Sequence, residues 1–368
     1  MKLHQKIILV ASILTLASPA FALDQIVRQW QSLRTDGMGG VFLTTGLYDQ
    51  NFFGNPARAT ANPHWKVTIL DPTVETSGST ISHISDLTGG GDTLANVAAT
   101  TGNNLHARIQ LGPSVYITPK ESKWAFAAGI LVSTQTDVEI QQNFSVDEDV
   151  YVDAGPAFTI ARKLLDDDAL SVGATVHYVY RFSSQKTFTF QDLAGGQSLS
   201  PSTAAGQGAG PQIDIGGTYR LPFQVLGFDL VGAAAIDNIN ANAFGSNLNL
   251  APNITGNPVP QNRSIGFGGA MMKSEVGPFT DCVGAIEFSD IGNNPNGGLF
   301  RTVHIGTEGR FGVLRGRLGI NQGYFTAGVG LILPVALSIE AATYGEEMSL
   351  NPGGQEDRRY AIRIALEI

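Results

Sequence analysis

The chain ends in a stretch in which apolar residues alternate strictly with small or charged ones. One face of this stretch carries Tyr360, Ile362, Ile364, Leu366 and Ile368. A period of two is that of a β-strand whose two faces lie in different environments. A final strand with a wholly apolar face is typical of a barrel that closes in a lipid bilayer, because that strand pairs with the first one and faces lipid.

The same alternation, bounded by turn residues, recurs along the chain and predicts fourteen strands. They are expected near 64–71, 105–117, 123–133, 150–162, 169–181, 210–220, 226–237, 264–274, 280–289, 301–312, 314–321, 323–333, 335–345 and 358–368. Long connections at 72–104, 134–149, 182–209, 238–263, 290–300 and 346–357 alternate with short ones almost throughout. Bacterial outer-membrane barrels have an even number of strands, short periplasmic turns and long external loops. The pattern therefore predicts an all-β fold, a transmembrane antiparallel β-barrel of about 14 strands over residues 64–368. The alternative, a soluble all-β protein, has no reason to sort its loops by length.

Charged residues of the later strands fall on the face opposite the apolar one. Because a charge that faces lipid near the midplane costs about 2–4 kcal/mol, we expect these side chains to line the lumen. They either stabilise the wall as ion pairs or form a path along which a proton or a substrate moves. They are Glu287, Glu308, Arg310, Arg315, Arg317, Glu340, Arg363 and Glu367.

The N-terminus has the features of a secretory signal. Lys2 and Lys6 precede a short apolar run, and residues 18–22 place small side chains where a signal peptidase cuts. The run is too short to span a bilayer as a helix. Residues 1–22 are therefore predicted to be a signal peptide cleaved after Ala22, with an uncleaved membrane anchor as the alternative. We expect the mature protein in the outer membrane of a Gram-negative cell, in contact with its lipid.

Residues 23–63 form a segment of their own before the first strand. Ile26, Val27, Trp30 and Leu33 are spaced for one side of a short helix, which the glycines at 37–40 end. About forty residues are more than a barrel needs before its first strand. Such a segment can fold back into the lumen and close it as a hatch.

Composition and motifs exclude several other functions. The net charge of −9 disfavours nucleic acid as a partner, because phosphate binding requires a basic face. The six histidines are scattered without the spacing of a metal site, and the sequence has no phosphate-binding loop. We therefore expect no cofactor and no metal ion. The single cysteine, Cys282, cannot form an internal disulfide.

Short glycine-based motifs resemble those of FadL-like outer-membrane barrels, including the PorV-like branch. The run Gly37-Met38-Gly39-Gly40 followed by Asn55-Pro56-Ala57 looks like the N-terminal signature of that superfamily. Further motifs follow in the family's order at 210–219 and 306–330. Phe52, Phe53 and Arg58 depart from the small residues usual there, and the chain ends in Ile368 rather than in an aromatic residue. The resemblance implies a fourteen-stranded barrel with an N-terminal hatch.

The resemblance also implies uptake of hydrophobic small molecules such as long-chain fatty acids or hydrocarbons. The gate would comprise Gly37, Gly39, Gly40, Asn55, Pro56 and Ala57. The solute would pass the hatch and leave sideways through the wall, which is reasonable because an apolar solute gains nothing from a water-filled pore.

Two other classes of function are open. PorV-like relatives act in protein secretion, so an assembly barrel that binds a secreted protein with its external loops is the main alternative. An outer-membrane enzyme would need a histidine with a serine or an aspartate at the rim, and His177 with Ser183 and Ser184 is the nearest candidate. A histidine on a strand that faces a lumen is more often structural, so we expect no enzyme.

Overall fold

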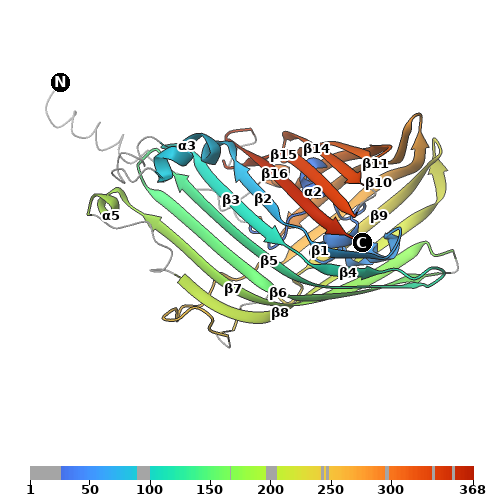
Figure 1. Ribbon diagram of the computed structural model, residues 1–368, viewed down its shortest axis with the longest axis horizontal. Coiled ribbons are helices and arrows are strands. Elements are labelled where there is room, and N and C mark those ends of the chain that lie inside the picture. Colours follow the sequence, from blue (N-terminus) through green and yellow to red (C-terminus); the bar gives the residue numbers. More distant parts are fainter. Residues whose placement is uncertain are drawn as a thin grey trace, which may run out of the picture.

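The computed structural model is an antiparallel β-barrel with part of the N-terminal segment inside it (Figure 1). It describes residues 26–88, 100–165, 167–195, 205–241, 244–245, 248–294, 298–333, 336–349 and 353–368. The expected signal peptide, residues 1–22, lies outside the described residues. Within these ranges, the helices are all too short or too polar to cross a bilayer.

The barrel wall consists of sixteen strand segments that form fourteen strands. β1 (Lys66–Leu70) and β2 (Thr73–Ser77) are two halves of one strand, since both pair with β16. β3 (Asn104–Leu111) and β4 (Ser114–Ile117) are likewise halves of the next, since both pair with β5. The others are β5 (Trp124–Ile140), β6 (Val146–Leu164), β7 (Leu170–Phe188), β8 (Ala205–Val225), β9 (Phe228–Asp237), β10 (Ser264–Val276), β11 (Phe279–Ile291), β12 (Val303–Phe311), β13 (Leu314–Asn321), β14 (Tyr324–Leu333), β15 (Leu337–Glu347) and β16 (Glu356–Glu367). The predicted fold and strand number are confirmed.

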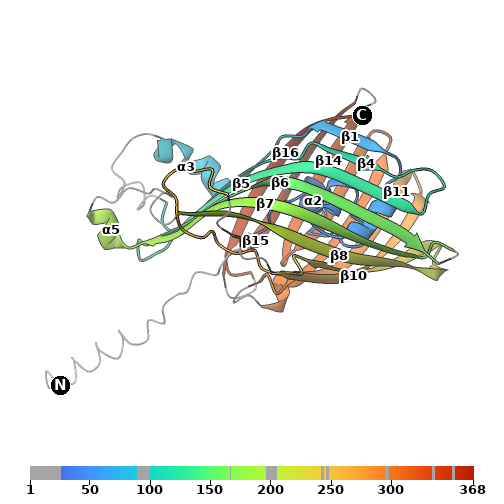
Figure 2. The same cartoon turned by 90° about the horizontal axis from the view of Figure 1, so that it is seen from below.

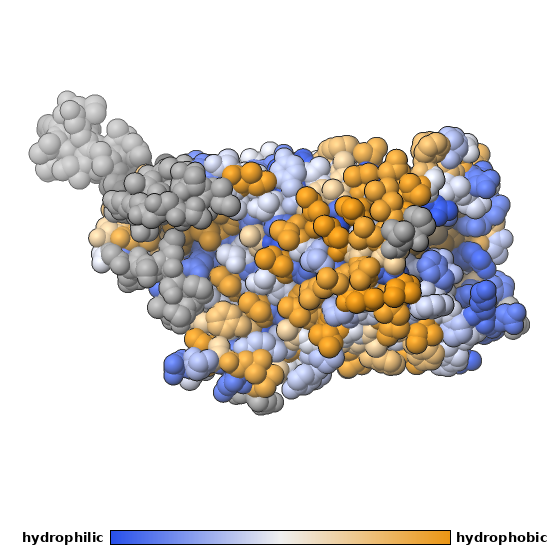
Figure 3. Space-filling view, in the orientation of Figure 1, coloured by the Kyte–Doolittle hydropathy of each residue, from blue (hydrophilic) through white to orange (hydrophobic). Residues whose placement is uncertain are grey.

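The last strand closes the barrel against the first. β16 pairs with β15 on one side and with β1 and β2 on the other. Tyr360, Ile362 and Ile364 are exposed on its outer face, whereas Arg363 on the opposite face is buried. Figure 3 shows apolar side chains gathered over a broad area of the outer surface. The apolar face of the strand pattern is thus the outer face of the wall.

The two ends of the barrel differ in their connections. Short turns join β4 to β5, β6 to β7, β8 to β9, β10 to β11 and β12 to β13 at the end where β1 begins and β16 finishes, called here the turn end. The opposite, loop end carries α3 (Gly78–Thr88), α5 (Phe190–Ala194), η4 (Leu299–Thr302) and the connection at 238–263. β13 and β14 are joined at the loop end by residues 322–323 alone, the brief connection that the sequence also shows.

One expected loop is largely strand, and another is strand in part. β5 and β6 continue through most of 134–149, and β7 and β8 take up parts of 182–209. These extensions are stabilised beyond the expected strand ends by a small apolar cluster that buries Leu105, Ile140, Val146, Phe188 and Leu193. Leu193 belongs to α5, so this cluster depends on a contact that strand periodicity does not reveal.

Two prolines change the predicted first strands. The strand expected over 105–117 is interrupted at Gly112-Pro113, and the loop expected from residue 72 begins with Pro72 and then β2. Proline has no N–H to donate to a ladder, which is why both interruptions occur at one. They lie side by side in the wall, because β1 pairs with β4 and β2 pairs with β3.

The expected helix of the N-terminal segment is much shorter than the spacing predicts. α2 covers only Leu33–Gly37, and residues 26–32 are not helical. The backbone oxygen of Val27 instead accepts hydrogen bonds from Gln261 and Asn293 of the loop end, at 3.1 Å each. Two 3₁₀ turns follow, η1 (Tyr48–Asn51) and η2 (Pro56–Ala61). Contacts with the wall therefore replace the helix that apolar spacing alone suggests.

Candidate functional site

Residues 26–63, called here the N-terminal segment, lie in the lumen with α2 surrounded by strands, as Figure 2 shows. Arg34 of α2 links it to the wall through a buried ion pair. The Arg34 guanidinium donates to both carboxylate oxygens of Glu308, at 3.0 Å each, and also to Thr45 O and Gln50 Oε1. Arg317 donates to the same Glu308 at 2.7 Å. Glu308 is thus shared between the segment and the wall.

Glu287 holds a second part of the segment through its backbone. Its carboxylate accepts hydrogen bonds from the N–H groups of Phe42, Leu43 and Thr44 at 2.7–2.8 Å. Thr44 Oγ1 donates to it as well. Three successive N–H groups aimed at one buried carboxylate make a fixed anion site within the protein.

The glycines of the expected gate press against the wall at the turn after α2. Gly39 has a φ of +70°, and a Cβ there would lie 2.2 Å from Ile305 O. Its own carbonyl oxygen lies 3.0 Å from His304 Nδ1. A Cβ on Gly37 would lie 2.9 Å from Gly328 Cα of β14, and one on Gly40 would lie 2.2 Å from His304 Nδ1. The lack of a side chain at 37, 39 and 40 therefore permits backbone-to-wall contact.

Asn55, Pro56 and Ala57 lie at the other side of the lumen, against β7 and β8. Asn55 Oδ1 caps η2 by accepting from Ala57 N, and Asn55 Nδ2 donates to Leu43 O and to Gly217 O at 2.9 and 3.2 Å. Pro56 packs on Gly173 of β7. The next residue, Arg58, is buried, and this burial together with the nearby Arg34 lowers the pKa of Arg58 to about 10. Arg58 therefore stays protonated at neutral pH.

The remaining charges singled out in the sequence lie on the lumen side of β12 to β16. Arg317 and Arg363 both reach Glu340, and Arg363 also reaches Glu367 at 2.9 Å. Lys66 of β1 pairs with the same Glu367 at 2.9 Å. This chain of ion pairs crosses the seam where the last strand meets the first. Arg310 and Arg315 lie near the turn end, where both reach Asp281.

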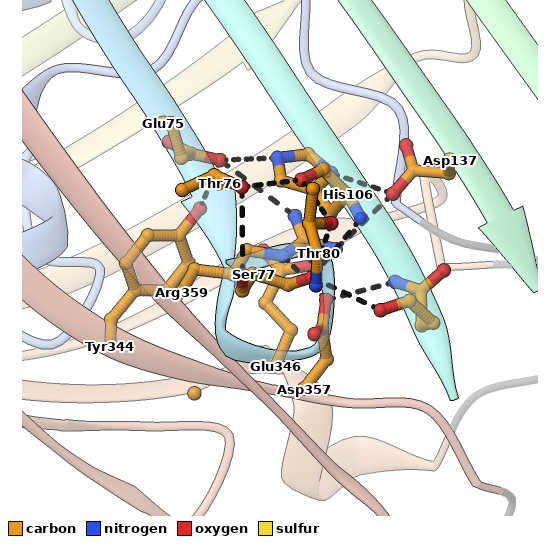
Figure 4. Close-up of polar contacts among 12 residues, drawn as sticks. Glu75, Thr76, Ser77, Thr80, His106, Asp137, Tyr344, Glu346, Asp357 and Arg359 are labelled. Carbon is orange, nitrogen blue, oxygen red and sulfur yellow. Dashed lines mark hydrogen bonds and ion pairs between the residues drawn. The ribbon is translucent and has the colours of Figure 1, made fainter. Parts of the chain in front are cut away.

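A second charge cluster stands at the loop-end half of the same seam (Figure 4). His106 lies between Glu75 and Asp137, with each ring nitrogen 2.6 Å from a carboxylate oxygen. Because ionised carboxylates only accept, both ring nitrogens donate in this arrangement. Arg359 adds a 2.8 Å ion pair with Asp357. The side chains labelled in Figure 4 converge from β2, α3, β3, β5, β15 and β16.

This second cluster continues into the N-terminal segment. Arg108 donates to Glu75 and to Gln31 Oε1, at 3.3 and 2.8 Å. Gln31 Nε2 in turn donates to Asp36 at 2.5 Å. Burial, and then the negative charge of Glu75, raise the pKa of Asp36. An unbroken chain of polar contacts therefore joins the seam of the barrel to α2.

The opposite side of the segment is apolar. Trp30, Phe52 and Tyr116 form a buried cluster with Ala127 and Leu131, and Tyr48 and Phe53 pack against it. Tyr116 lies on β4 and Leu131 on β5, so this aromatic cluster faces the wall that contains the two interruptions. Lumen-facing ion pairs thus run along β11 to β16 and continue across the seam to β2, β3 and β5, whereas the aromatic cluster packs against β4 to β6.

The wall has a gap beside the aromatic cluster. Between the pairs Thr68–Ser114 and Thr73–Gln110 the first two strands are not paired. Among the described residues, the one hydrogen bond that bridges this stretch comes from a side chain, since Asp71 Oδ1 accepts from Gly112 N at 2.6 Å. A Cβ on Gly112 would lie 2.8 Å from the Trp30 ring, so the aromatic cluster reaches the gap from the lumen.

Several of these residues were not identified as functional from the sequence pattern. Asp71, Gly112 and Trp30 meet only after the barrel closes, although two X-Pro steps within strand patterns are a local signal that the pairing is interrupted. Arg28 was not identified either, yet it reaches Asp290 and Glu346 at 2.7 and 2.8 Å. Nothing in the local pattern distinguishes Arg28 from a solvated charge.

The candidate catalytic group is not assembled. His177 Nε2 lies 2.6 Å from Asp214, and Phe53 stacks on the His177 ring at 4.3 Å. Ser183 is six residues along the same strand, a distance of about 20 Å at the rise of a β-strand, and its hydroxyl accepts from Val259 N. In the described part of the chain, the acidic, histidine and cysteine side chains form no group of three or more that could hold a metal ion.

The fold resembles that of solved hydrocarbon channels. The toluene transporter TbuX of Ralstonia pickettii aligns with a TM-score of 0.52 at 12% identity, over 92% of this chain and 98% of that one. The toluene transporter TodX of Pseudomonas putida aligns at 0.51 and 13%, over 94% and 99%. The monoaromatic hydrocarbon channel CymD aligns at 0.51 and 12%, over 95% and 98%. The likeness is one of fold.

The sequence itself matches no family model and no curated protein. The barrel architecture expected from the FadL-like resemblance is nevertheless confirmed by these alignments, which cover almost the whole chain. The similar proteins are named as transporters and a channel rather than as enzymes. The expected secreted-protein partner is untested and stays a prediction.

Proposed function

We propose that this protein is an integral outer-membrane channel that takes up small hydrophobic molecules through a lumen gated by its N-terminal segment. The loop end faces the outside of the cell and the turn end faces the periplasm. The similar solved structures, named for toluene and monoaromatic hydrocarbons, support this class of solute. The untested roles of residues 23–63 as a hatch and of Asn55, Pro56 and the glycines as its gate belong to this proposal.

The observation that carries the proposal is the aromatic cluster beside the gap in the wall. Trp30 packs against Gly112, where the Asp71 side chain makes the hydrogen bond that bridges the first two strands of the wall. An apolar solute that passes along this cluster stays out of water and reaches lipid directly through the gap. On β11 and β12, Glu287 and Glu308 hold the segment in place.

Uptake of labelled toluene tests the proposal in cells of a Gram-negative host that lack hydrocarbon channels of their own. We expect expression of the protein to raise the initial rate of uptake several-fold over the empty host. Gly112→Leu fills the lumen side of the gap, because a Cβ there already meets Trp30 and Leu131. This variant is expected to return uptake to the background rate.

Gly284→Leu is the matched control. It introduces the same side chain into β11, where a Cβ meets nothing within 4 Å. It is expected to take up toluene at the wild-type rate. The shift in gel mobility on heating reports whether each barrel is folded. Wild-type uptake no greater than the background rejects the function, and a folded Gly112→Leu variant with full uptake rejects the route through the gap.

A further inference from the structure

The lumen contains a cavity whose chemistry differs from that of a hydrocarbon site. It has a volume of about 90 Å³ and lies between residues 27–36 and the loop-end parts of β8 to β11. Trp30, Phe42 and Phe53 give it aromatic walls. An engineered cavity of about 150 Å³ holds one benzene molecule. The space therefore suits the head group of a small molecule and not a whole acyl chain.

Charge around the cavity is strongly one-sided. The charged residues that line it are Asp36, Asp214, Asp237, Asp290 and the single cation Arg28. Arg28 is already engaged by Asp290 and by Glu346. A ligand carboxylate would lie among four aspartates. The Arg28 guanidinium would not compensate for their repulsion, because it is already paired with Asp290 and Glu346. The cavity is thus unsuited to a fatty acid.

Most of these carboxylates have partners within the protein, but one oxygen of Asp237 has none among the described residues. Asp214 accepts from His177 and from Asn238 N, and Asp36 accepts from Gln31. Asp237 Oδ1 is buried and has no hydrogen-bond partner among the described residues. A buried carboxylate oxygen without a donor is costly, and a cation placed beside it removes that cost.

A second unpartnered group lines the same cavity. Ser289 is 2% exposed, and its Oγ has no hydrogen-bond partner in the described part of the chain. Ser264 of β10 lies opposite Asp237 of β9 in the ladder, and Ser289 belongs to the next strand, β11. Asp237 and Ser289 therefore present two open acceptors from neighbouring parts of the wall.

We propose that this cavity binds the ammonium head of a small apolar amine, which donates to Asp237 Oδ1 and Ser289 Oγ, while its apolar body extends out of the cavity along Trp30 and Phe53 of the aromatic cluster. This assignment rests on the proposed uptake function and adds amines with an apolar body to the hydrocarbons as its solutes. An ammonium group supplies the donors that both acceptors lack, and aromatic faces attract a cation.

Calorimetric titration of the purified full chain in detergent tests the assignment with three ligands of one shape at about pH 7. They are benzylamine, benzyl alcohol and benzoate, which share a phenyl ring and carry a cationic, a neutral and an anionic head group. We expect benzylamine to bind at least tenfold more tightly than benzyl alcohol, and benzoate not to bind. Equal or tighter binding of benzyl alcohol, or binding of benzoate, overturns the assignment.

Variants locate the binding site. Asp237→Asn is expected to lower the ratio of benzylamine to benzyl alcohol affinity about tenfold, and Ser289→Ala severalfold. Asp229→Asn, on the same strand but bonded to Gln224 near the turn end, is the control and keeps the wild-type ratio. An unchanged ratio in a folded Asp237→Asn variant removes Asp237 from the site. Toluene uptake without preference for the amine overturns only this inference, whereas amine binding without toluene uptake overturns only the proposed function.

Discussion

Arg34→Met removes a buried charged link between the N-terminal segment and the wall. The side chain loses its bonds to Glu308, Thr45 O and Gln50, all between 2.8 and 3.2 Å. Removing one partner of a buried ion pair typically costs about 3–5 kcal/mol. Because Glu308 keeps Arg317 at 2.7 Å, we expect the low end of that range. A loss of about 3 kcal/mol shifts the equilibrium between the docked and released segment by about a hundredfold.

Amide hydrogen exchange followed by mass spectrometry measures this equilibrium, since exchange of docked amides tracks their opening. Peptides from residues 33–51 are expected to exchange about a hundredfold faster in Arg34→Met, while peptides from the strands keep their wild-type rates. Arg310→Met is the matched control, because its partner Asp281 and Arg310 itself are 52% and 41% exposed. An exposed pair contributes less than about 1 kcal/mol.

The reasoning is refuted if a folded Arg34→Met barrel exchanges residues 33–51 within fivefold of the wild type. It is also refuted if Arg310→Met accelerates exchange as much as Arg34→Met does. The first result would mean that the aromatic cluster alone holds the segment. The second would mean that burial of the ion pair does not set its contribution.

Three further changes probe the gate. Gly39→Ala places a Cβ 2.2 Å from Ile305 O at a φ of +70°, so residues 38–41 are expected to lose exchange protection, whereas Gly316→Ala, with nothing within 4 Å, changes no rates. Asn55→Ala with Pro56→Ala removes the cap of η2 and the hydrogen bonds to Leu43 O and Gly217 O. This double variant is expected to take up less toluene than the wild type. Heat-dependent gel mobility should show that its barrel still assembles. Asp36→Asn tests how docking of the N-terminal segment depends on pH. Burial raises the pKa of Asp36. Docking in the wild type is therefore strongest below the ordinary aspartate pKa and weakens as the pH rises through the raised pKa. Asparagine still accepts from Gln31 but does not titrate. In a Trp65→Phe, Trp124→Phe background, quenching of Trp30 fluorescence should therefore lose its dependence on pH in the variant. An equally steep dependence in the variant would assign the titration to another group.

Much of the candidate site can be located by sequence pattern, because alternation assigns each strand residue to a face. Glu287, Glu308 and Arg317 fall on the lumen side for that reason, and they lie there in the structure. Alternation does not say which charges meet. That Glu287 receives three backbone N–H groups, and that Glu308 is shared with Arg34, depends on the path of a segment with no period of its own.

The local pattern fails where contacts from distant parts of the chain outweigh it. Apolar spacing over residues 26–33 suggests a helix, yet the oxygen of Val27 bonds to Gln261 and Asn293, more than two hundred residues away. The polar stretches at 134–149 and 182–209 suggest loops, yet strands occupy most of the first and both ends of the second, where Leu193 covers a small apolar cluster. In both places a tertiary contact stabilises a conformation that the local sequence alone does not favour.

The sequence by itself determined the architecture. A period of two with one apolar face leaves only a closed sheet in lipid, and the alternation of short and long connections sets the number and direction of the strands. Only the tertiary structure decided which charges pair in the lumen, where the aromatic cluster packs, where the wall has its gap, and which carboxylate is left without a donor. The physical reason is that faces are set by local geometry, whereas partners are set by closure of the barrel around a segment that folds against it.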